Sequence, residues 1–260
     1  MGKFDGYLIC SDLDGTFQCG AETARINSEA VEYYTQNGGK FTFATGRTVS
    51  YLRQYEFIKY VNAPACLYNG GIIYDYKNEK VLFEKRLNFP IKDFAGVAGE
   101  GLKNAECIVI YHDYMAEEGV ACQIKDIPDT ILGVKPIKIV CIFKSTEDAD
   151  SFKKMAKGQK LFEHCYISKS WNVSVEFNIN EATKGHGLKF IKNHLGGIHT
   201  AVGIGDYEND IPLIQQADIG VAVGNAVDDL KSIANIIVKP GADCAVKDLI
   251  EILERNGQLQ

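Results

Sequence analysis

The chain has 260 residues, of which 46% are hydrophobic and 24% are charged, and its formal net charge is −6. This composition is that of an ordinary globular protein whose core needs no disulfide framework. The acidic balance argues against nucleic acid or an anionic membrane as a partner, because both attract basic surfaces. No apolar run approaches the ~20 residues of a membrane span.

The N-terminal residues begin a strand at once, without the apolar stretch found in signal peptides. The eight cysteines are widely and irregularly spaced, and no two of them form a CxxC pair. This spacing indicates reduced cysteines that serve as small buried side chains in a reducing compartment. We therefore expect a cytoplasmic protein with free cysteines.

Three short apolar runs each end in polar residues, at 7–10, 40–44 and 200–204. Apolar runs bounded by Gly or Asp are typical of strands buried on both faces of a parallel sheet. A crossover helix is predicted between the first two runs. It should begin at Asn27 or Ser28, either of which can cap a helix, and it should end at a glycine pair.

Helices and strands alternate again after the third run. This βαβ rhythm predicts a doubly wound, Rossmann-like α/β core with a parallel sheet. Helices are expected at 210–216, 227–234 and 244–255, and strands at 219–223 and 236–238.

The middle of the chain has a different pattern, with apolar and polar residues in alternation. Alternation of period two is typical of strands with one exposed face. We expect an inserted α+β cap domain at 85–180, and a catalytic core formed by 1–84 and 181–260. The cap strands are expected at 106–111, 119–124, 137–143 and 174–178, and its helices at 94–103 and 148–157.

Asp12 and Asp14 follow the first predicted strand, two residues apart. Residues i and i+2 of an extended chain point to the same side, so the two carboxylates repel unless a cation or a proton separates them. Mg²⁺ suits such a site because it prefers hard oxygen ligands. The alternative is a turn cluster, since Asp and Gly favour turns.

Thr45, Gly46 and Arg47 end the second predicted strand. A hydroxyl beside free backbone amides can hold a phosphoryl oxygen, although Thr in this place is also an ordinary helix cap. Lys184 lies at a predicted helix start, where it could neutralise a phosphoryl group. A solvated surface lysine is the alternative.

Asp206 and Asp210 lie in an acidic loop after the third predicted strand. They are four residues apart, so a helix beginning here would turn both to one site. Asp206 would bind a metal directly and Asp210 would orient it, unless the loop is only a capping box. In an open parallel sheet, ligands bind beyond the carboxyl ends of the strands, where all these acids are expected.

The chain resembles, at four places in order, the motifs of the haloacid dehalogenase-like hydrolase superfamily. These places are residues 12–16, Thr45, Lys184 and residues 205–210. Residues 44–47, 68–71 and 220–226 are similar to its Cof-type (IIB) branch, which mostly dephosphorylates sugar phosphates and related metabolites. The stretch between Thr45 and Lys184 is the only gap long enough for a cap.

This resemblance implies a two-step phosphatase reaction, in which Asp12 forms an aspartyl-phosphate and Asp14 is the acid and base. Mg²⁺ would be bound by Asp12, the Asp14 backbone carbonyl and Asp206, with support from Asp210. The expected phosphate and substrate contacts are Thr45, Gly46, Arg47, Asn69, Lys184, Asn209 and, from the cap, Glu176.

The substrate expected from the resemblance is a small phosphorylated metabolite, with sugar phosphates favoured. A phosphotransferase or phosphomutase of the same superfamily is one alternative, and a non-catalytic phosphate-binding module is another. Trp171 could equally contact substrate or serve the cap core, and His186 is expected to have only local bonds. Hinges for cap closure are expected at 83–88 and 178–183. The sequence does not indicate an oligomeric state.

Overall fold

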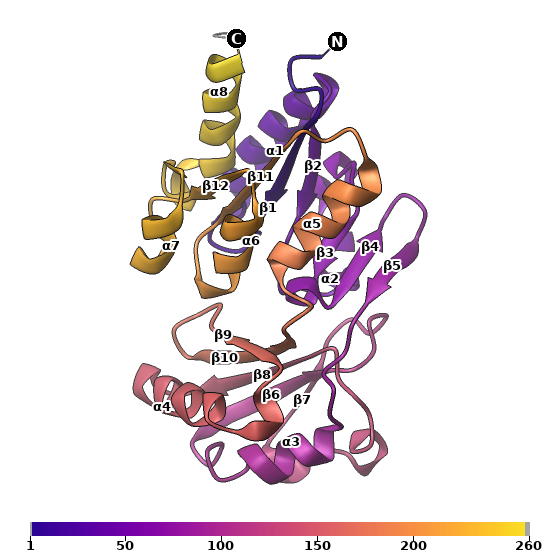
Figure 1. Cartoon of the computed structure of the whole chain (residues 1–260), viewed down its shortest axis with the longest axis vertical. Coiled ribbons are helices and arrows are strands. Elements are labelled where there is room, and N and C mark those ends of the chain that lie inside the picture. The colour runs from indigo at the N-terminus through magenta and orange to yellow at the C-terminus, as the bar shows by residue number, and fades with distance from the viewer. Residues whose placement is uncertain (1, 258–260) are drawn as a thin grey trace.

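The computed structural model describes residues 2–257. A five-stranded parallel sheet forms its upper part in Figure 1, in the order β13-β12-β11-β1-β2. All three predicted apolar runs are strands of this sheet. The strands are β1 (Tyr7–Ser11), β2 (Lys40–Phe43), β11 (Thr200–Gly205), β12 (Ile219–Ala222) and β13 (Ile236–Ile237).

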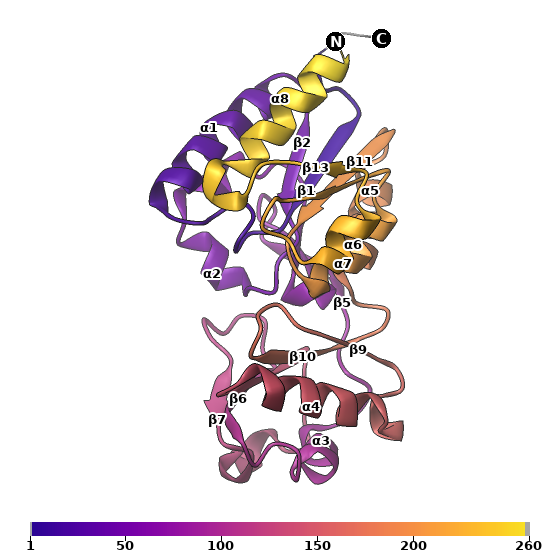
Figure 2. The ribbon, with the colours of Figure 1, turned by 90° about the vertical axis from the view of Figure 1, so that its left-hand side faces the viewer.

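Helices cover both faces of the parallel sheet. Figure 2 shows α1 (Ala21–Gln36) and α8 (Ala245–Gly257) on one side of it, with α5 (Lys184–Leu195), α6 (Ile211–Gln216) and α7 (Asp228–Ile233) on the other. The short α2 (Val49–Arg53) follows β2. This arrangement confirms the doubly wound, Rossmann-like core.

The first helix starts earlier than predicted, with Gly20 rather than Asn27 or Ser28 as its N-cap. Asn27 is fully buried within α1. Its side-chain nitrogen donates to the Phe17 carbonyl at 2.8 Å, and its side-chain oxygen accepts from the Lys247 amide at 3.0 Å. The asparagine therefore stabilises contacts of α1 with a loop and with α8. In the sequence alone, such an asparagine cannot be distinguished from a helix N-cap.

A second five-stranded sheet lies below the first in Figure 1, and all its strand pairs are antiparallel. Its helices α3 (Ile91–Ala98) and α4 (Thr146–Lys157) cover the face that points away from the parallel sheet. This confirms an inserted α+β layer, whereas its limits at 85 and 180 stay a prediction. In spatial order its strands are β7 (Val120–Cys122), β6 (Ala105–Tyr111), β8 (Lys138–Phe143), β10 (Ser174–Ile179) and β9 (Cys165–Ser168).

The alternation in the second sheet has a different cause from the one predicted. All six residues of β10 are buried, and only one of the six in β8 is not. Val175 and Phe177 belong to the hydrophobic core beside α3 and α4. Ser174 and Glu176, on the opposite face, line a cavity instead of meeting bulk solvent. β9 was not predicted, because its four residues show no clear alternation.

A third, three-stranded antiparallel sheet was also not predicted. It consists of β3 (Ala65–Leu67), β4 (Ile72–Asp75) and β5 (Lys80–Glu84). Between β3 and β4 the chain makes a tight turn in which Tyr68, Asn69 and Gly70 have φ values of 53°, 59° and 114°. Three consecutive left-handed residues are unusual and strained for side chains other than glycine.

Both connections to the second sheet run past this turn. On the way out, the Lys85 amide donates to the Gly71 carbonyl at 2.9 Å. On the way back, the Thr183 carbonyl lies 2.4 Å from the place that a Cβ on Gly70 would occupy. Glycine at position 70 is therefore needed for its φ and for this close approach. The predicted hinges at 83–88 and 178–183 lie in these connections and stay predictions.

Among residues 2–257, no helix combines the length and apolar character that crossing a membrane requires. All eight cysteines are free, and Cys10, Cys66 and Cys141 are buried, as expected for small apolar side chains.

Candidate active site

The candidate site lies where β1 and β11 end side by side. These strands pair in parallel with Ser11 opposite Ile204, so Asp12 and Asp206 leave the sheet from adjacent strands at the same edge. β2 lies on the other side of β1 and places Thr45 at that edge. The strand order reverses between β1 and β11, since β2 lies on one side of this pair and β12 and β13 lie on the other. Open α/β sheets bind ligands in the crevice that forms at such a point.

Lys184 connects the two halves of this edge. Its ammonium donates to Asp12 Oδ1 and to Asp210 Oδ1, both at 2.6 Å, and its side chain is fully buried. Burial lowers the pKa of Lys184, but the two carboxylates outweigh it, so its pKa lies well above the ordinary value. The alternative of a solvated surface lysine is wrong, because Lys184 is completely buried between two carboxylate partners.

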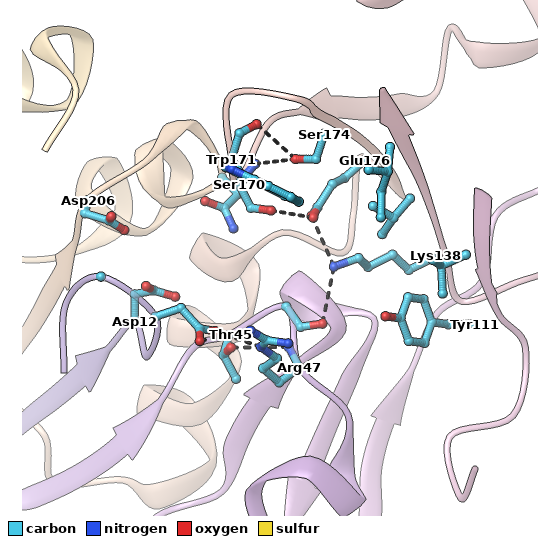
Figure 3. A pocket seen from close by; sticks show the side chains of 17 residues that line it. Asp12, Thr45, Arg47, Tyr111, Lys138, Ser170, Trp171, Ser174, Glu176 and Asp206 are labelled. Carbon is cyan, nitrogen blue, oxygen red and sulfur yellow. Dashed lines mark hydrogen bonds and ion pairs between the residues drawn. The ribbon is translucent and has the colours of Figure 1, made fainter. Parts of the chain in front are cut away.

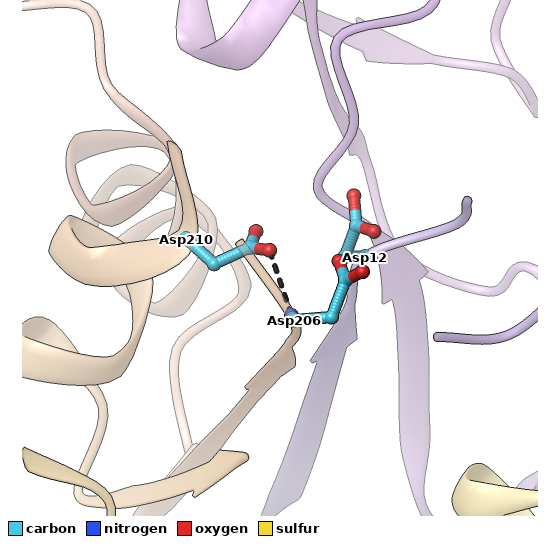
Figure 4. Close-up of side chains that lie close together, drawn as sticks. All are labelled: Asp12, Asp206 and Asp210. Carbon is cyan, nitrogen blue, oxygen red and sulfur yellow. Dashed lines mark hydrogen bonds between the residues drawn. The ribbon is translucent and has the colours of Figure 1, made fainter. Parts of the chain in front are cut away.

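Asp12, Asp206 and Asp210 each offer a carboxylate oxygen within 4.8 Å of the others (Figure 4). Asp210 is already occupied, since its Oδ2 accepts the amides of Asp206 and Tyr207 at 3.0 and 3.2 Å. Asp12 and Asp206 therefore have the oxygens best placed for a cation, and an all-oxygen set fits Mg²⁺. Asp210 orients the loop that carries Asp206.

The titration of these acids reflects the crowding of negative charge. Burial and then the charge of Asp210 raise the pKa of Asp206 to about 7. Burial raises the pKa of Asp12 well above its ordinary value, although Lys184 opposes this shift. A divalent cation between Asp12 and Asp206 would remove much of this cost, because opposite charge favours the ionised carboxylates.

The carboxylate of Asp14 points away from this cluster. It accepts from Arg47 Nε at 2.8 Å and from Arg47 Nη2 at 3.0 Å, in a two-pronged ion pair whose side chains are about half exposed. The Arg47 guanidinium also lies 4.4 Å from the ring centre of Tyr51. Asp14 and Arg47 thus lie together in the partly exposed lining of the cavity.

The other residues predicted at the core side lie in or beside the same cavity. Thr45 is buried, and its hydroxyl accepts the amide of Arg47 at 3.2 Å. Gly46 lines the cavity beside it. Asn209 also lines the cavity, and its side chain donates to Asn69 Oδ1 at 3.2 Å. The expected convergence of these residues is therefore present.

The second sheet closes the site on the side opposite the parallel sheet. The cavity between the two sheets has a volume of about 480 Å³ (Figure 3). We call the wall that the second sheet contributes the roof. The roof consists of Val109, Tyr111, Lys138, Val140, Ile142, Ser170, Trp171, Ser174 and Glu176.

Lys138 and Glu176 form a buried ion pair in the roof, with 3.1 Å between Lys138 Nζ and Glu176 Oε2 and side chains only 4% exposed. Lys138 also donates to the Gly46 carbonyl at 3.2 Å. Glu176 accepts from Ser170 Oγ and from Asn69 Nδ2, both at 2.5 Å. This network contacts the core at Gly46 and Asn69.

Lys138 and Ser170 were not identified from the sequence. Lys138 lies between the buried Ile137 and Ile139, and a lysine in such an alternating pattern indicates the solvent side of a strand. Glu176 does line the cavity, as predicted, and so does Trp171, whose side chain remains 54% exposed. His186 is exposed and its ring contacts the Thr183 hydroxyl at 2.9 Å, so it has only local bonds.

Comparison with known proteins agrees with this geometry. Residues 9–250 match the family described as haloacid dehalogenase-like hydrolase. Phosphoglycolate phosphatase 1 of Saccharolobus solfataricus is 26% identical, over 95% of each chain. The chain is 23% identical over 94% of its length to the chloroplastic endoribonuclease YBEY of Arabidopsis thaliana, but it spans only 46% of that protein.

The fold matches that of a solved haloacid dehalogenase subclass IIB sugar phosphatase. The TM-score is 0.72 at 22% identity, and the match covers 95% of this chain and 98% of the other.

Proposed function

This chain belongs to the haloacid dehalogenase-like hydrolase family, and we propose that it hydrolyses small phosphate monoesters with Mg²⁺ as its metal and Asp12 as its nucleophile. The observation that carries the proposal is the position of Asp12. Its carboxylate accepts from the Lys184 ammonium, has an oxygen within 4.8 Å of one of Asp206, and lines a cavity large enough for a small ester.

In the first step, an oxygen of Asp12 attacks the phosphorus atom and the ester P–O bond breaks. The leaving alcohol takes its proton from Asp14, for which Asp14 must be protonated and turned from Arg47 toward the ester oxygen. Thr45 and Lys184 lie beside Asp12 and hold the phosphoryl oxygens. Negative charge on these oxygens is thereby stabilised by groups that are already in place.

In the second step, a water molecule attacks the phosphorus of the aspartyl-phosphate. Asp14, now ionised, takes a proton from this water, and the P–O bond to Asp12 breaks to release inorganic phosphate. When bound, Mg²⁺ supplies positive charge to the phosphoryl group. Asp12, Asp206 and the backbone carbonyl of Asp14 would hold it, and Asp210 keeps the Asp206 loop in place.

For the substrate, we favour sugar phosphates and related polyol phosphates. The roof presents hydroxyl, amino and carboxylate groups from Ser170, Lys138 and Glu176, which can bond to several hydroxyls at once. Val140 and Trp171 add an apolar surface beside them, against which the C–H face of a sugar can pack.

The test is phosphate release from sugar phosphates, nucleotides and p-nitrophenyl phosphate, measured with Mg²⁺ and with EDTA. We expect release that depends on Mg²⁺ and is fastest for one or a few sugar phosphates. No release from any ester by folded protein would contradict the proposal, and release only after a second sugar is added would indicate a phosphotransferase or mutase.

A further inference from the structure

The roof contains a lysine that neither the sequence motifs nor the two-step reaction accounts for. Lys138 lies in the middle strand of the second sheet, across the cavity from Asp12 (Figure 3). Burying its ammonium is costly without a partner. Glu176 supplies that partner, and the pair therefore presents donors and acceptors to the cavity without net charge.

Glu176 is held ready for this role by further donors. Its Oε1 accepts from Ser170 and its Oε2 from Asn69. Burial raises the pKa of Glu176, but Lys138 and these hydrogen bonds outweigh it, so the pKa lies below the ordinary value. Lys138 has three N–H donors, of which Glu176 and the Gly46 carbonyl take two. One donor remains for a ligand.

The cavity as a whole has no surplus positive charge for a second anion. Its two cations are each matched, Arg47 by Asp14 and Lys138 by Glu176. The remaining lining carboxylates, Asp12 and Asp206, give an excess of two negative charges. The buried Lys184 and Asp210 add one charge of each sign and leave this excess unchanged. One divalent cation balances it, before the phosphoryl group arrives.

We infer that Lys138 and Glu176 are a specificity-determining pair, which binds an uncharged leaving group through a hydroxyl and discriminates against a leaving group that carries a second negative charge. This inference rests on the proposed phosphatase function and narrows its substrates. A carboxylate or second phosphate beneath the roof would lie beside the negative charge of Glu176. Lys138 neutralises this charge but leaves no net positive charge to attract a second anion.

The test compares two esters of nearly the same size. Glycerol 3-phosphate and 3-phosphoglycerate differ in that a hydroxymethyl group of the first is a carboxylate in the second. We expect the wild-type protein to favour glycerol 3-phosphate in kcat/KM by about tenfold or more, because like charges repel strongly in a poorly solvated site.

Two substitutions should move this preference in opposite directions. Glu176→Gln leaves the ammonium of Lys138 uncancelled, and should shift the ratio toward 3-phosphoglycerate by about tenfold, mainly through KM. Lys138→Met leaves the Glu176 charge uncancelled, and should shift it further toward glycerol 3-phosphate. Lys192→Met breaks a lysine–aspartate pair outside the cavity and should leave the ratio unchanged.

The outcomes separate this inference from the function on which it rests. In one outcome, the wild-type protein releases phosphate from p-nitrophenyl phosphate while neither substitution changes the kcat/KM ratio of the two esters; in another, both change it in the same direction. Either result overturns the inference and leaves the proposed function standing. A wild-type preference for 3-phosphoglycerate overturns it even if the variants fail to fold. No release from any ester overturns both the function and the inference.

Discussion

Two buried lysines, Lys184 at the end of the parallel sheet and Lys138 in the roof, differ in how firmly they keep their charge. Lys184, at the edge of the parallel sheet, has two carboxylates at 2.6 Å, and its pKa is raised. Lys138, in the roof, has one carboxylate at 3.1 Å and one carbonyl at 3.2 Å. Burial dominates there and lowers its pKa. The number and distance of carboxylates, more than burial, therefore decides how firmly a buried lysine keeps its proton.

The difference follows from where the partners come from. Asp12 and Asp210, the partners of Lys184, both lie at the edge of the parallel sheet beside α5. The contacts of Lys138 are split, since Glu176 belongs to the second sheet and Gly46 to the core. We therefore expect the charge at the core side to be independent of the position of the second sheet. The roof network would change whenever that sheet moved.

The largest effect should come from the acid that Lys184 holds. Asp12→Asn removes the proposed nucleophile, and we expect phosphate release to fall by about a thousandfold or more. The far-UV circular dichroism should stay unchanged, because the amide can still accept from Lys184. Asp243→Asn, at an exposed position, serves as a control and should keep full activity. Near-normal release by Asp12→Asn would contradict the proposed role of Asp12.

The two lysines should differ in their contribution to stability. In EDTA, we expect Lys184→Met to lower the free energy of unfolding by about 3–5 kcal/mol, because two buried carboxylates lose their partner. Lys138→Met should cost about 1–3 kcal/mol, since Glu176 keeps its bonds to Ser170 and Asn69. Denaturant titration measures both. Equal losses of unfolding free energy in the two variants would show that the number of carboxylate partners does not decide how much each lysine contributes to stability.

The metal proposed for the core side should compete with protons. The pKa of Asp206 is raised to about 7 without metal, so Mg²⁺ must displace a proton below that pH. We expect the increase in Tm caused by Mg²⁺ to be large near pH 8 and to shrink as the pH falls through about 7. The same shift means that metal-free protein loses stability as the pH rises through about 7.

Thermal unfolding with and without Mg²⁺ across this pH range measures the effect, and Asp206→Asn is the control. This variant should remove both the Mg²⁺-dependent increase and its pH dependence. A stabilisation by Mg²⁺ that is independent of pH in the wild-type protein would place the metal away from Asp206.

The smallest effect should come from the contact between roof and core. A Cβ on Gly46 would lie 2.8 Å from Lys138 Nζ and 3.0 Å from Asn69 Oδ1, and both are movable side-chain ends. We expect Gly46→Ala to displace Lys138 and to raise KM by about threefold to tenfold, with stability changed by less than about 1 kcal/mol. Steady-state kinetics with the best substrate checks this, and an unchanged KM would mean that the contact has no part in binding.

The core side of the site could be predicted from the sequence because each of its residues follows a recognisable element. Asp12, Thr45 and Asp206 stand just beyond apolar strands, and Lys184 begins a helix. In a parallel sheet such positions meet at one edge whatever the rest of the fold is. The sequence pattern around each of these residues is therefore enough to predict that their side chains lie close together.

The roof could not be predicted in the same way. The role of Lys138 depends on its contacts with Glu176 and Gly46. Antiparallel pairing of β8 with β10 brings Glu176 near it, and the approach of the two sheets brings Gly46 near it. The alternating pattern of β8 shows that one face is polar, but not whether that face meets water or a cavity. The strands β3 and β9 are three and four residues long, too short for a periodic signal.

The turn at Tyr68–Gly70, past which both connections to the second sheet run, has a mechanical consequence. It can act as a pivot, and displacement during a rotation grows with the lever arm from that pivot. Asn178 lies close to it and donates to the Tyr68 carbonyl at 2.8 Å. Trp171 lies at the other end of the β9–β10 hairpin. A small rotation about this turn would therefore leave the contacts of Asn178 almost in place. Lifting Trp171, in contrast, would require the hydrogen bond from the Asn209 amide to the Lys169 carbonyl, 3.2 Å long, to break.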